Sequence, residues 1–254
     1  MKPSQVKKAY SLAKKHKLEI FPVFQNRYNL AVKRVKKAIK KNEIGKINIV
    51  NVRVRWCRPQ KYYDLSDWRG TFSHDGGALT NQGIHHIDLM RYLLGEIKEV
   101  YCYMQTFGSN IEVEDTAVAT MKFLSGAIGT VEVTTSARPD DFEASISFVG
   151  SKGLAQIGGV AVNELQIFSP NPKECKKYSD NYNDLDDRGK VYGRGHYDIY
   201  KSIQSHFYQK KPYPVSKEDC YQTIKLLHSF YKSSEIKKSV YLKSNFESEN
   251  LGKQ

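Results

Sequence analysis

Residues 47–56 read INIVNVRVRW, and this stretch decides the class of fold that we expect. Val50, Val52 and Val54 alternate with polar neighbours, which is the two-residue period of a strand with one buried face. Continuous apolar runs are typical of strands that are covered on both faces. The alternation therefore predicts a sheet with one covered and one open face.

Similar patterns follow along the rest of the chain. Further strands are predicted over 97–107, 115–124, 127–137, 142–149, 154–157, 162–168 and 240–242. Helices are predicted over 29–45, 77–94, 195–209 and 216–236. Because most of the strands follow one another directly, we predict an α+β fold, a large and mostly antiparallel open sheet with helices on one face.

The N-terminal 24 residues differ from the rest. A helix is predicted over 4–15, and LEIFPVF, at 18–24, is typical of a strand that is covered on both faces. We interpret 1–24 as the remnant of a Rossmann fold whose strand edge is either mobile or paired with a second molecule. Residues 25–243 would form the α+β domain for substrate binding and oligomerisation, and 244–254 a frayed tail.

The net charge of +13 is concentrated at one end of the chain. Residues 1–46 hold 12 Lys and two Arg against Glu19 and Glu43, which accounts for +12 of it. The lysines fall on predicted helix faces, and no nucleic-acid-binding motif accompanies them, so we expect no nucleic-acid partner.

The remaining composition points to a cytoplasmic protein without a membrane partner. No apolar run approaches the roughly 18 residues that span a bilayer, and no signal peptide is evident. Four scattered cysteines without a CxxC pair predict reduced thiols and no metal site.

The densest polar motif is GGALTNQGIHHIDLMRYLLGE, at 76–96. One continuous helix would place Asn81, His85 and Asp88 on one polar line, opposite an apolar face. His85 is the candidate for proton transfer, because an unperturbed imidazole has a pKa of about 6.5. The alternative is a polar helix face that only hydrogen-bonds neighbouring loops.

A second motif is the loop RPQKYYDLSDWRG, at 58–70. Arg58 and Arg69 offer planar donors for a carboxylate or phosphate, and Tyr62, Tyr63 and Trp68 offer flat faces for a ring or base. The alternative is a packed loop that covers a sheet edge.

Two smaller clusters complete the candidate residues. Gln25, Arg27 and Tyr28 follow the predicted strand 18–24, at the end where α/β folds bind ligands. His196 lies in GRGHYD, at 193–198, which lacks the third glycine of a dinucleotide fingerprint and follows a loop. We therefore assign no cofactor-binding residue.

Together these segments resemble the Gfo/Idh/MocA family of NAD(P)-dependent oxidoreductases, and within it the WlbA-type dehydrogenases that oxidise the 3-hydroxyl of UDP-N-acetylglucosaminuronic acid. The resemblance reaches to about residue 243. It is carried by QNRYN (25–29), RVRWCRPQKYYDLSDWRG (53–70), DGGALTNQGIHHIDL (75–89), GHYDIY (195–200) and KKPYPVSKED (210–219).

The resemblance implies roles for single residues. Met1-Lys2-Pro3 matches the family's Glu-Lys-Pro motif with Met in place of Glu, so Lys2 and His85 are the implied catalytic residues. One or both would take the hydroxyl proton while hydride leaves for the nicotinamide. The implied substrate-binding residues are Gln25, Arg27, Tyr28, Arg58, Tyr63, Trp68, Arg69, Asn81 and His196.

The resemblance also implies NAD or NADP as cofactor, a nucleotide-sugar substrate and a homo-oligomer formed through the sheet face. The glycine-rich half of the nucleotide-binding domain is missing, so we expect the chain alone to bind NAD weakly or not at all. Three interpretations stay open. A separate chain supplies that half, the start of the gene is misassigned, or the chain is a non-catalytic nucleotide-sugar-binding or assembly module.

Overall fold

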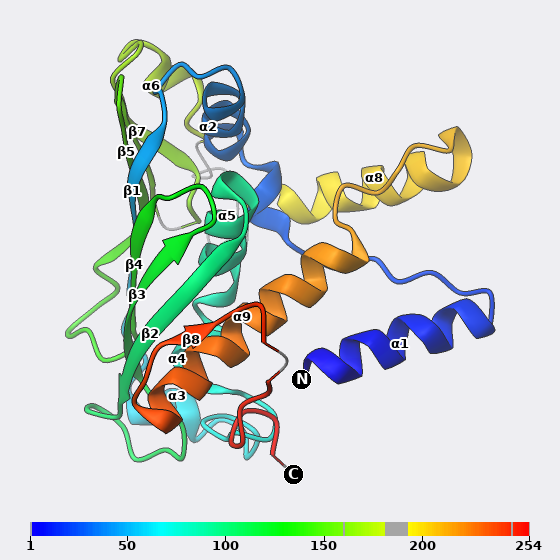
Figure 1. Ribbon diagram of the computed structural model, residues 1–254, viewed down its shortest axis with the longest axis vertical. Coiled ribbons are helices and arrows are strands. Elements are labelled where there is room, and N and C mark those ends of the chain that lie inside the picture. The colour runs from blue at the N-terminus through cyan, green and yellow to red at the C-terminus, as the bar shows by residue number, and fades with distance from the viewer. Residues whose placement is uncertain (1, 160, 181–192, 245, 254) are drawn as a thin grey trace.

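The computed structural model describes residues 2–159, 161–180, 193–244 and 246–253. One large sheet forms a wall of the molecule, and helices α2, α5 and α9 lie on the same side of it (Figure 1). The strands are β1 (Ile47–Arg55), β2 (Ile97–Gln105), β3 (Thr116–Phe123), β4 (Ile128–Thr134), β5 (Glu143–Gly150), β6 (Leu154–Gly158), β7 (Glu164–Phe168) and β8 (Val240–Tyr241). The described helices are α1 (Pro3–Lys15), η1 (Gln25–Tyr28), α2 (Leu30–Lys40), α3 (Gln60–Tyr63), α4 (Gly77–Asn81), α5 (Ile84–Leu94), α6 (Glu174–Lys177), α8 (Gly195–Gln209) and α9 (Lys217–Ile236).

The sheet has eight strands in the order β7-β6-β5-β1-β4-β3-β2-β8. Every neighbouring pair is antiparallel except β1 and β4, which are parallel. The α+β prediction is therefore confirmed, as is the half-buried pattern of β1, because Val50, Val52 and Val54 are fully buried.

The core lies between the covered face of the sheet and the helices. Phe148 of β5, Ile87 of α5 and Phe230 of α9 belong to one buried apolar cluster. Burial of each such side chain contributes about 1.5–3 kcal/mol. Among the described helices, none is long and apolar enough to cross a membrane.

The prediction of one helix over 77–94 was wrong, because Gly83 separates α4 from α5. A Cβ atom at Gly83 would lie 2.6 Å from the Leu79 carbonyl oxygen and 3.1 Å from Val133 of β4. The backbone thus packs close to the sheet at this position. The Gly83 N–H bonds to the Ala78 carbonyl, five residues back, which widens this turn and shifts Asn81 relative to the face of α5.

The predicted strand over 18–24 was also wrong. These residues pair with no strand in the described part of the chain, and they connect α1 to the sheet as an arm beside the body (Figure 1). Phe21 packs edge-on against Phe207 and Tyr213, and the Tyr213 hydroxyl donates to the Pro22 carbonyl. An apolar run forms a strand only where a neighbouring strand offers backbone hydrogen bonds. In the described part of the chain, residues 18–24 instead pack against α8 and the loop that follows it. The descent of this segment from a Rossmann fold stays a prediction.

The C-terminal residues do not fray, contrary to expectation. Ser248 and Leu251 are buried, and the Glu235 carboxylate accepts hydrogen bonds from the backbone N–H groups of Glu249 and Asn250. A side chain of α9 therefore holds the segment 246–253 in place. The polar composition of this segment does not show that contact.

Candidate functional site

His85 lies in the first turn of α5, against the ring of Phe24. The two ring centroids are 6.3 Å apart at an interplanar angle of 82°. Burial lowers the pKa of His85; Asp88 opposes this effect, and neighbouring His196 adds to it. Among the described residues, the buried Nδ1 atom has no hydrogen-bond partner. The imidazole is therefore neutral at neutral pH and can accept a proton.

Two residues of η1 place further unpartnered polar atoms beside Phe24. Arg27 lies over the Phe24 ring at 5.2 Å, and its buried Nη1 has no partner within the described chain. The same holds for Oε1 of Gln25, the next residue after Phe24. Buried polar atoms without partners cost free energy, so the unpartnered atoms of His85 and Arg27, which both lie against Phe24, and of the adjoining Gln25 are candidates to bind a polar ligand.

Arg27 nevertheless has its main partners inside the protein. Its Nε and Nη2 donate to the two oxygens of Asp88 at 2.7 and 2.6 Å, and Nη2 also lies 3.3 Å from Asp219. Asp88 is completely buried, so its prediction on an exposed polar line with Asn81 and His85 was wrong. The pair joins η1, α5 and α9, and it supports His85 three residues earlier on α5. A direct contact between Arg27 and substrate stays a prediction.

The loop at 58–70 forms a ladder of alternating aromatic rings and guanidinium groups. Arg58 lies 5.3 Å from the Trp56 ring and 5.6 Å from the Tyr62 ring, and Arg69 lies 4.2 Å from Tyr62 and 4.6 Å from Trp68. We call these five residues the ladder. Stacking fixes both guanidinium groups without using all of their N–H donors.

The two arginines of the ladder differ in their remaining partners. Arg58 donates to Asp141 at 2.9 Å. Arg69 has no carboxylate partner among the described residues, and its buried Nε is unpartnered. Arg69 is thus the cation of the ladder that is held in place and still available to an anion.

Tyr63 does not belong to the ladder. It is buried, its hydroxyl lies 2.8 Å from Thr135 Oγ1, and burial raises its pKa to about 12. Tyr63 is thus a buried support of the loop, whereas Tyr62, the other tyrosine expected to offer a flat face, stacks with Arg58 and Arg69. The sequence gives two adjacent tyrosines and no sign of which one faces outward.

Asn81 supports the same loop from α4. Its Nδ2 donates to Asp75, whose other oxygen accepts from the Gly70 backbone N–H at 2.6 Å. Asp75 is buried and was missed by the sequence prediction. The contact shows Asn81 as a brace of the turn that precedes α4.

The structure does not join the two predicted catalytic residues. Lys2 is the N-cap of α1, beside Glu247, and no hydrogen bond or ion pair links it to His85 within the described residues. Met1 of the predicted motif lies outside the described residues. A catalytic role of Lys2 stays a prediction.

Tyr28 and His196 are both placed at α8. The Tyr28 hydroxyl donates to Ser202 at 3.0 Å, and His196 is exposed in the first turn of that helix. The helix approaches η1 closely, because a Cβ atom at Gly195 would lie 2.6 Å from the Gln25 carbonyl oxygen. Gly195 therefore allows α8 to bring His196 near His85.

Comparisons with known proteins agree on one family. The GFO/IDH/MocA C-terminal domain matches residues 32–156. The myo-inositol 2-dehydrogenase of Thermotoga maritima is 28% identical over 243 residues, which are 90% of this chain and 66% of that protein.

Two solved structures are also similar to this chain. The WlbA dehydrogenase of Bordetella pertussis, solved with NADH and UDP-GlcNAcA, is 34% identical, has a TM-score of 0.87, and aligns over 96% of this chain and 70% of its own. The WlbA dehydrogenase of Chromobacterium violaceum, with the same two ligands, is 34% identical with a TM-score of 0.84, over 96% and 68%. The chain therefore belongs to the GFO/IDH/MocA family of oxidoreductases, of which it spans the part that includes the C-terminal domain.

Proposed function

We propose that this chain is the substrate-binding part of an NAD(P)-dependent dehydrogenase of the WlbA type, which oxidises a hydroxyl group of a UDP-N-acetylhexosaminuronate. The observation that carries the proposal is the set of unpartnered polar atoms on His85 and Arg27, which both lie against Phe24, and on the adjoining Gln25. Two similar structures were solved with UDP-GlcNAcA, which fits a polar ligand of this kind.

In this proposal His85 accepts the proton of the substrate hydroxyl. Burial lowers its pKa, so the ring is the free base at neutral pH before the substrate arrives. The buried pair of Arg27 and Asp88 holds α5 and thereby the imidazole. Lys2 is a second expected proton carrier at the same hydroxyl.

Arg69 is the expected partner of the uronate carboxylate or of a phosphate. A guanidinium that is fixed between two rings loses little conformational freedom on binding, and it can donate two parallel hydrogen bonds. Arg58 and Trp68 hold the ladder around it, and Asn81 fixes the turn behind it.

The described residues do not fit a dinucleotide. A pyrophosphate needs backbone N–H groups at a glycine-rich turn that opens a helix. The glycines nearest to that pattern precede α8, but Gly195 is packed against the Gln25 carbonyl. The hydride transfer is therefore assigned to none of the described residues. We propose that NAD(P) is bound by a nucleotide-binding module outside the described residues, such as a separate chain.

The open face of the sheet is the expected site of self-association. Tyr103, Val118 and Ile128 are exposed on β2, β3 and β4. Apolar side chains on an uncovered sheet are typical of interfaces between subunits.

Calorimetric titration with UDP-GlcNAcA and UDP-GlcNAc tests the proposal. We expect the wild-type chain to bind UDP-GlcNAcA more tightly, because only this ligand carries the carboxylate. His85→Gln should still bind UDP-GlcNAcA, because glutamine keeps a hydrogen-bonding group at this position, yet give no NADH when NAD and a nucleotide-binding module are added. Failure of the wild-type chain to bind either ligand would favour the assembly module and reject the proposal.

A further inference from the structure

A polar cavity lies between α2 and α8, and its lining includes Tyr28 but neither Phe24 nor a residue of the ladder. Its volume is about 330 Å³, at the lower end of the range for ligand pockets. It is formed by η1, α2, α8 and the loop that follows α8. The lining residues are Tyr28, Lys33, Asp198, Lys201, Ser202, Ser205, Lys211, Pro212 and Pro214.

The charges of this cavity favour an anion. Three of its lining residues are lysines, and only Asp198 among them is acidic. Asp198 pairs with Lys33 at 3.8 Å. Lys201 and Lys211 have no carboxylate partner within the described residues, and Lys201 is held over the Tyr197 ring at 4.3 Å. Two ammonium groups are therefore left to bind an external anion.

The hydroxyl groups of the cavity differ in whether their proton is left for a ligand, because Tyr28 and Ser202 use theirs inside the protein. The Tyr28 hydroxyl donates to Ser202, which donates to the Asp198 backbone carbonyl at 2.9 Å. Ser205 lines the cavity one helical turn later. The lysines and the Ser205 hydroxyl form a donor set that suits phosphate oxygens, because each ammonium offers up to three N–H groups.

Helix α8 connects this cavity with the proposed reaction site. His196 lies in its first turn, close enough to His85 to lower the pKa of that residue. Asp198, Lys201, Ser202 and Ser205 follow on the same helix, roughly 3 to 14 Å further along its axis. A ligand that extended from His85 along α8 would therefore reach from the proposed reaction site to this cavity.

From these contacts we infer that the cavity between α2 and α8 binds a diphosphate group. The inference rests on the proposed function in one respect only: the diphosphate group would belong to the nucleotide-sugar substrate. Inorganic pyrophosphate carries the same chemistry and serves as the probe that is independent of the sugar.

The experiment is calorimetric titration at low salt with pyrophosphate, UDP, UDP-GlcNAcA and uridine. The Lys33→Ala/Lys201→Ala/Lys211→Ala variant should bind pyrophosphate and UDP about tenfold more weakly or worse, because each exposed charge contributes modestly. Asp198→Asn should bind both more tightly, since it removes the negative charge. Uridine should bind too weakly to measure.

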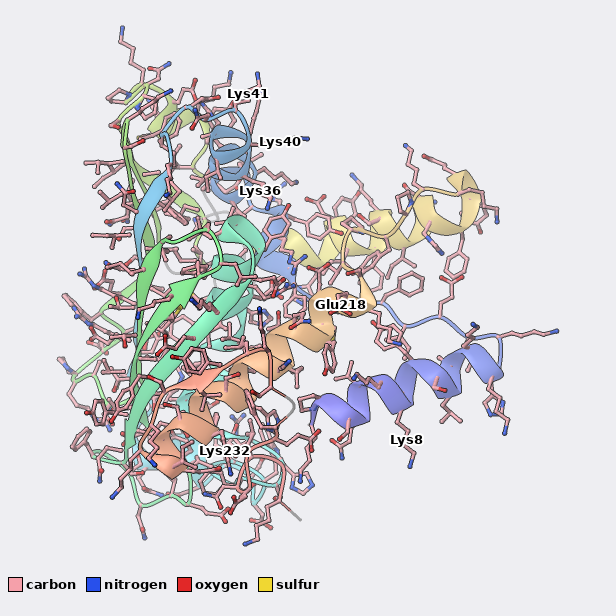
Figure 2. All side chains as sticks on the ribbon, viewed as in Figure 1. Lys8, Lys36, Lys40, Lys41, Glu218 and Lys232 are labelled. Atoms are coloured by element: carbon pink, nitrogen blue, oxygen red, sulfur yellow. The ribbon has the colours of Figure 1, made fainter. Side chains whose placement is uncertain are left out.

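The Lys37→Ala/Lys40→Ala/Lys41→Ala variant is the matched control, because it removes the same three charges at the C-terminal end of α2, where none of these lysines lines the cavity and where Lys40 and Lys41 are seen in Figure 2. It should bind as wild type does. The substituted lysines are exposed, and equal thermal melting curves would show that all variants fold.

The outcomes separate the two proposals. Equal binding of pyrophosphate by wild type and the triple variant would overturn the inference. Loss of UDP-GlcNAcA binding in Arg69→Ala, with no loss in the triple variant, would also overturn it and leave the proposed function standing. Lysine-dependent binding of pyrophosphate, without UDP-GlcNAcA binding by any variant, would support the cavity and reject the proposed function.

Discussion

Arg27 and Arg69 were both expected to bind substrate, yet they lie in two very different regions. Arg27 belongs to a closed network, in which Asp88 and Asp219 take most of its donors inside the protein. Arg69 belongs to the ladder, where Tyr62 and Trp68 hold it without any carboxylate among the described residues. The comparison shows that the neighbours of an arginine decide whether it stabilises the fold or awaits a ligand.

Removal of a carboxylate from the closed network should have the largest effect of the changes considered, and this effect is on the stability of the fold. We expect Asp88→Ala to lower the free energy of unfolding by about 3–5 kcal/mol, because it leaves the Arg27 cation buried without its partner. Urea unfolding measures this change. The double variant Arg27→Leu/Asp88→Leu should recover much of the loss, and the exposed Asp67→Ala should change little. A loss below about 1 kcal/mol in Asp88→Ala would mean that the network is not closed.

Glu114 sharpens the comparison, because it is a buried carboxyl that pairs with no cation among the described residues. Burial raises its pKa to about 8, against the hydrogen bonds from the Leu79 N–H and Tyr231, and Asp75 raises it further. Cys102, whose own pKa is raised by burial, is the other titratable neighbour. Below pH 8 the folded protein therefore holds a neutral Glu114.

This gives a definite dependence of stability on pH. The unfolded chain releases the Glu114 proton above pH 4.5 and the folded chain only near pH 8, so this residue lowers the stability as pH rises through that window. Glu114→Gln should match wild type near pH 5 and be more stable near pH 8, by on the order of 3 kcal/mol. Thermal melts across this range measure it, with Glu112→Gln as the exposed control. A constant difference between the two proteins at all pH values would show that Glu114 is ionised.

Arg69→Ala should weaken the affinity for UDP-GlcNAcA tenfold to hundredfold, as a charge-assisted contact of about 1.5–3 kcal/mol is lost. Its effect on the free energy of unfolding should stay below about 1 kcal/mol, in contrast to Asp88→Ala. Arg69→Lys should restore little, because a lysine lacks the planar donor pair. Titration calorimetry measures the affinity, and urea unfolding measures the stability. A large loss of stability in Arg69→Ala with unchanged affinity would show that Arg69 stabilises the fold and does not bind the ligand.

Tyr62→Leu should have the smallest effect of these variants, and this effect is on ligand affinity. It removes the ring between Arg58 and Arg69 and should weaken UDP-GlcNAcA binding about twofold to fivefold, the contribution of an exposed cation–π contact. Tyr62→Phe keeps the ring and serves as control. An equal loss in both variants would assign the effect to the hydroxyl, which accepts a hydrogen bond from Gln82.

The sequence predicted most of the sheet and only part of the site. The alternation around Val50 and Val54 was enough to predict β1, because one face of a strand is a local property. The break at Gly83 depends on the close approach of Val133, which no local pattern shows. The pairing of Arg27 with Asp88 likewise joins residues 61 positions apart, so composition alone suggested a ligand contact.

The lysines of the basic N-terminal part have different environments, which the sequence alone does not distinguish. Lys8 points from α1 away from α9 (Figure 2), as expected for a solvated lysine. Lys36, on α2, instead donates to the Tyr92 carbonyl of α5, and burial lowers its pKa. A lysine on a charged helix face can thus be part of a helix contact.

The parallel pair of β1 and β4 has a consequence for how the chain folds. Val50 pairs with Gly129 and Phe148, which follow it by 79 and 98 residues, so the central strand is completed only by distant segments. Long loops must close before such contacts form, which slows folding. The meander of β2, β3 and β4 can form earlier from near neighbours. The ladder and His85 both lie in the segment between β1 and β4, so the site should assemble late, in the same step that inserts β1 into the sheet.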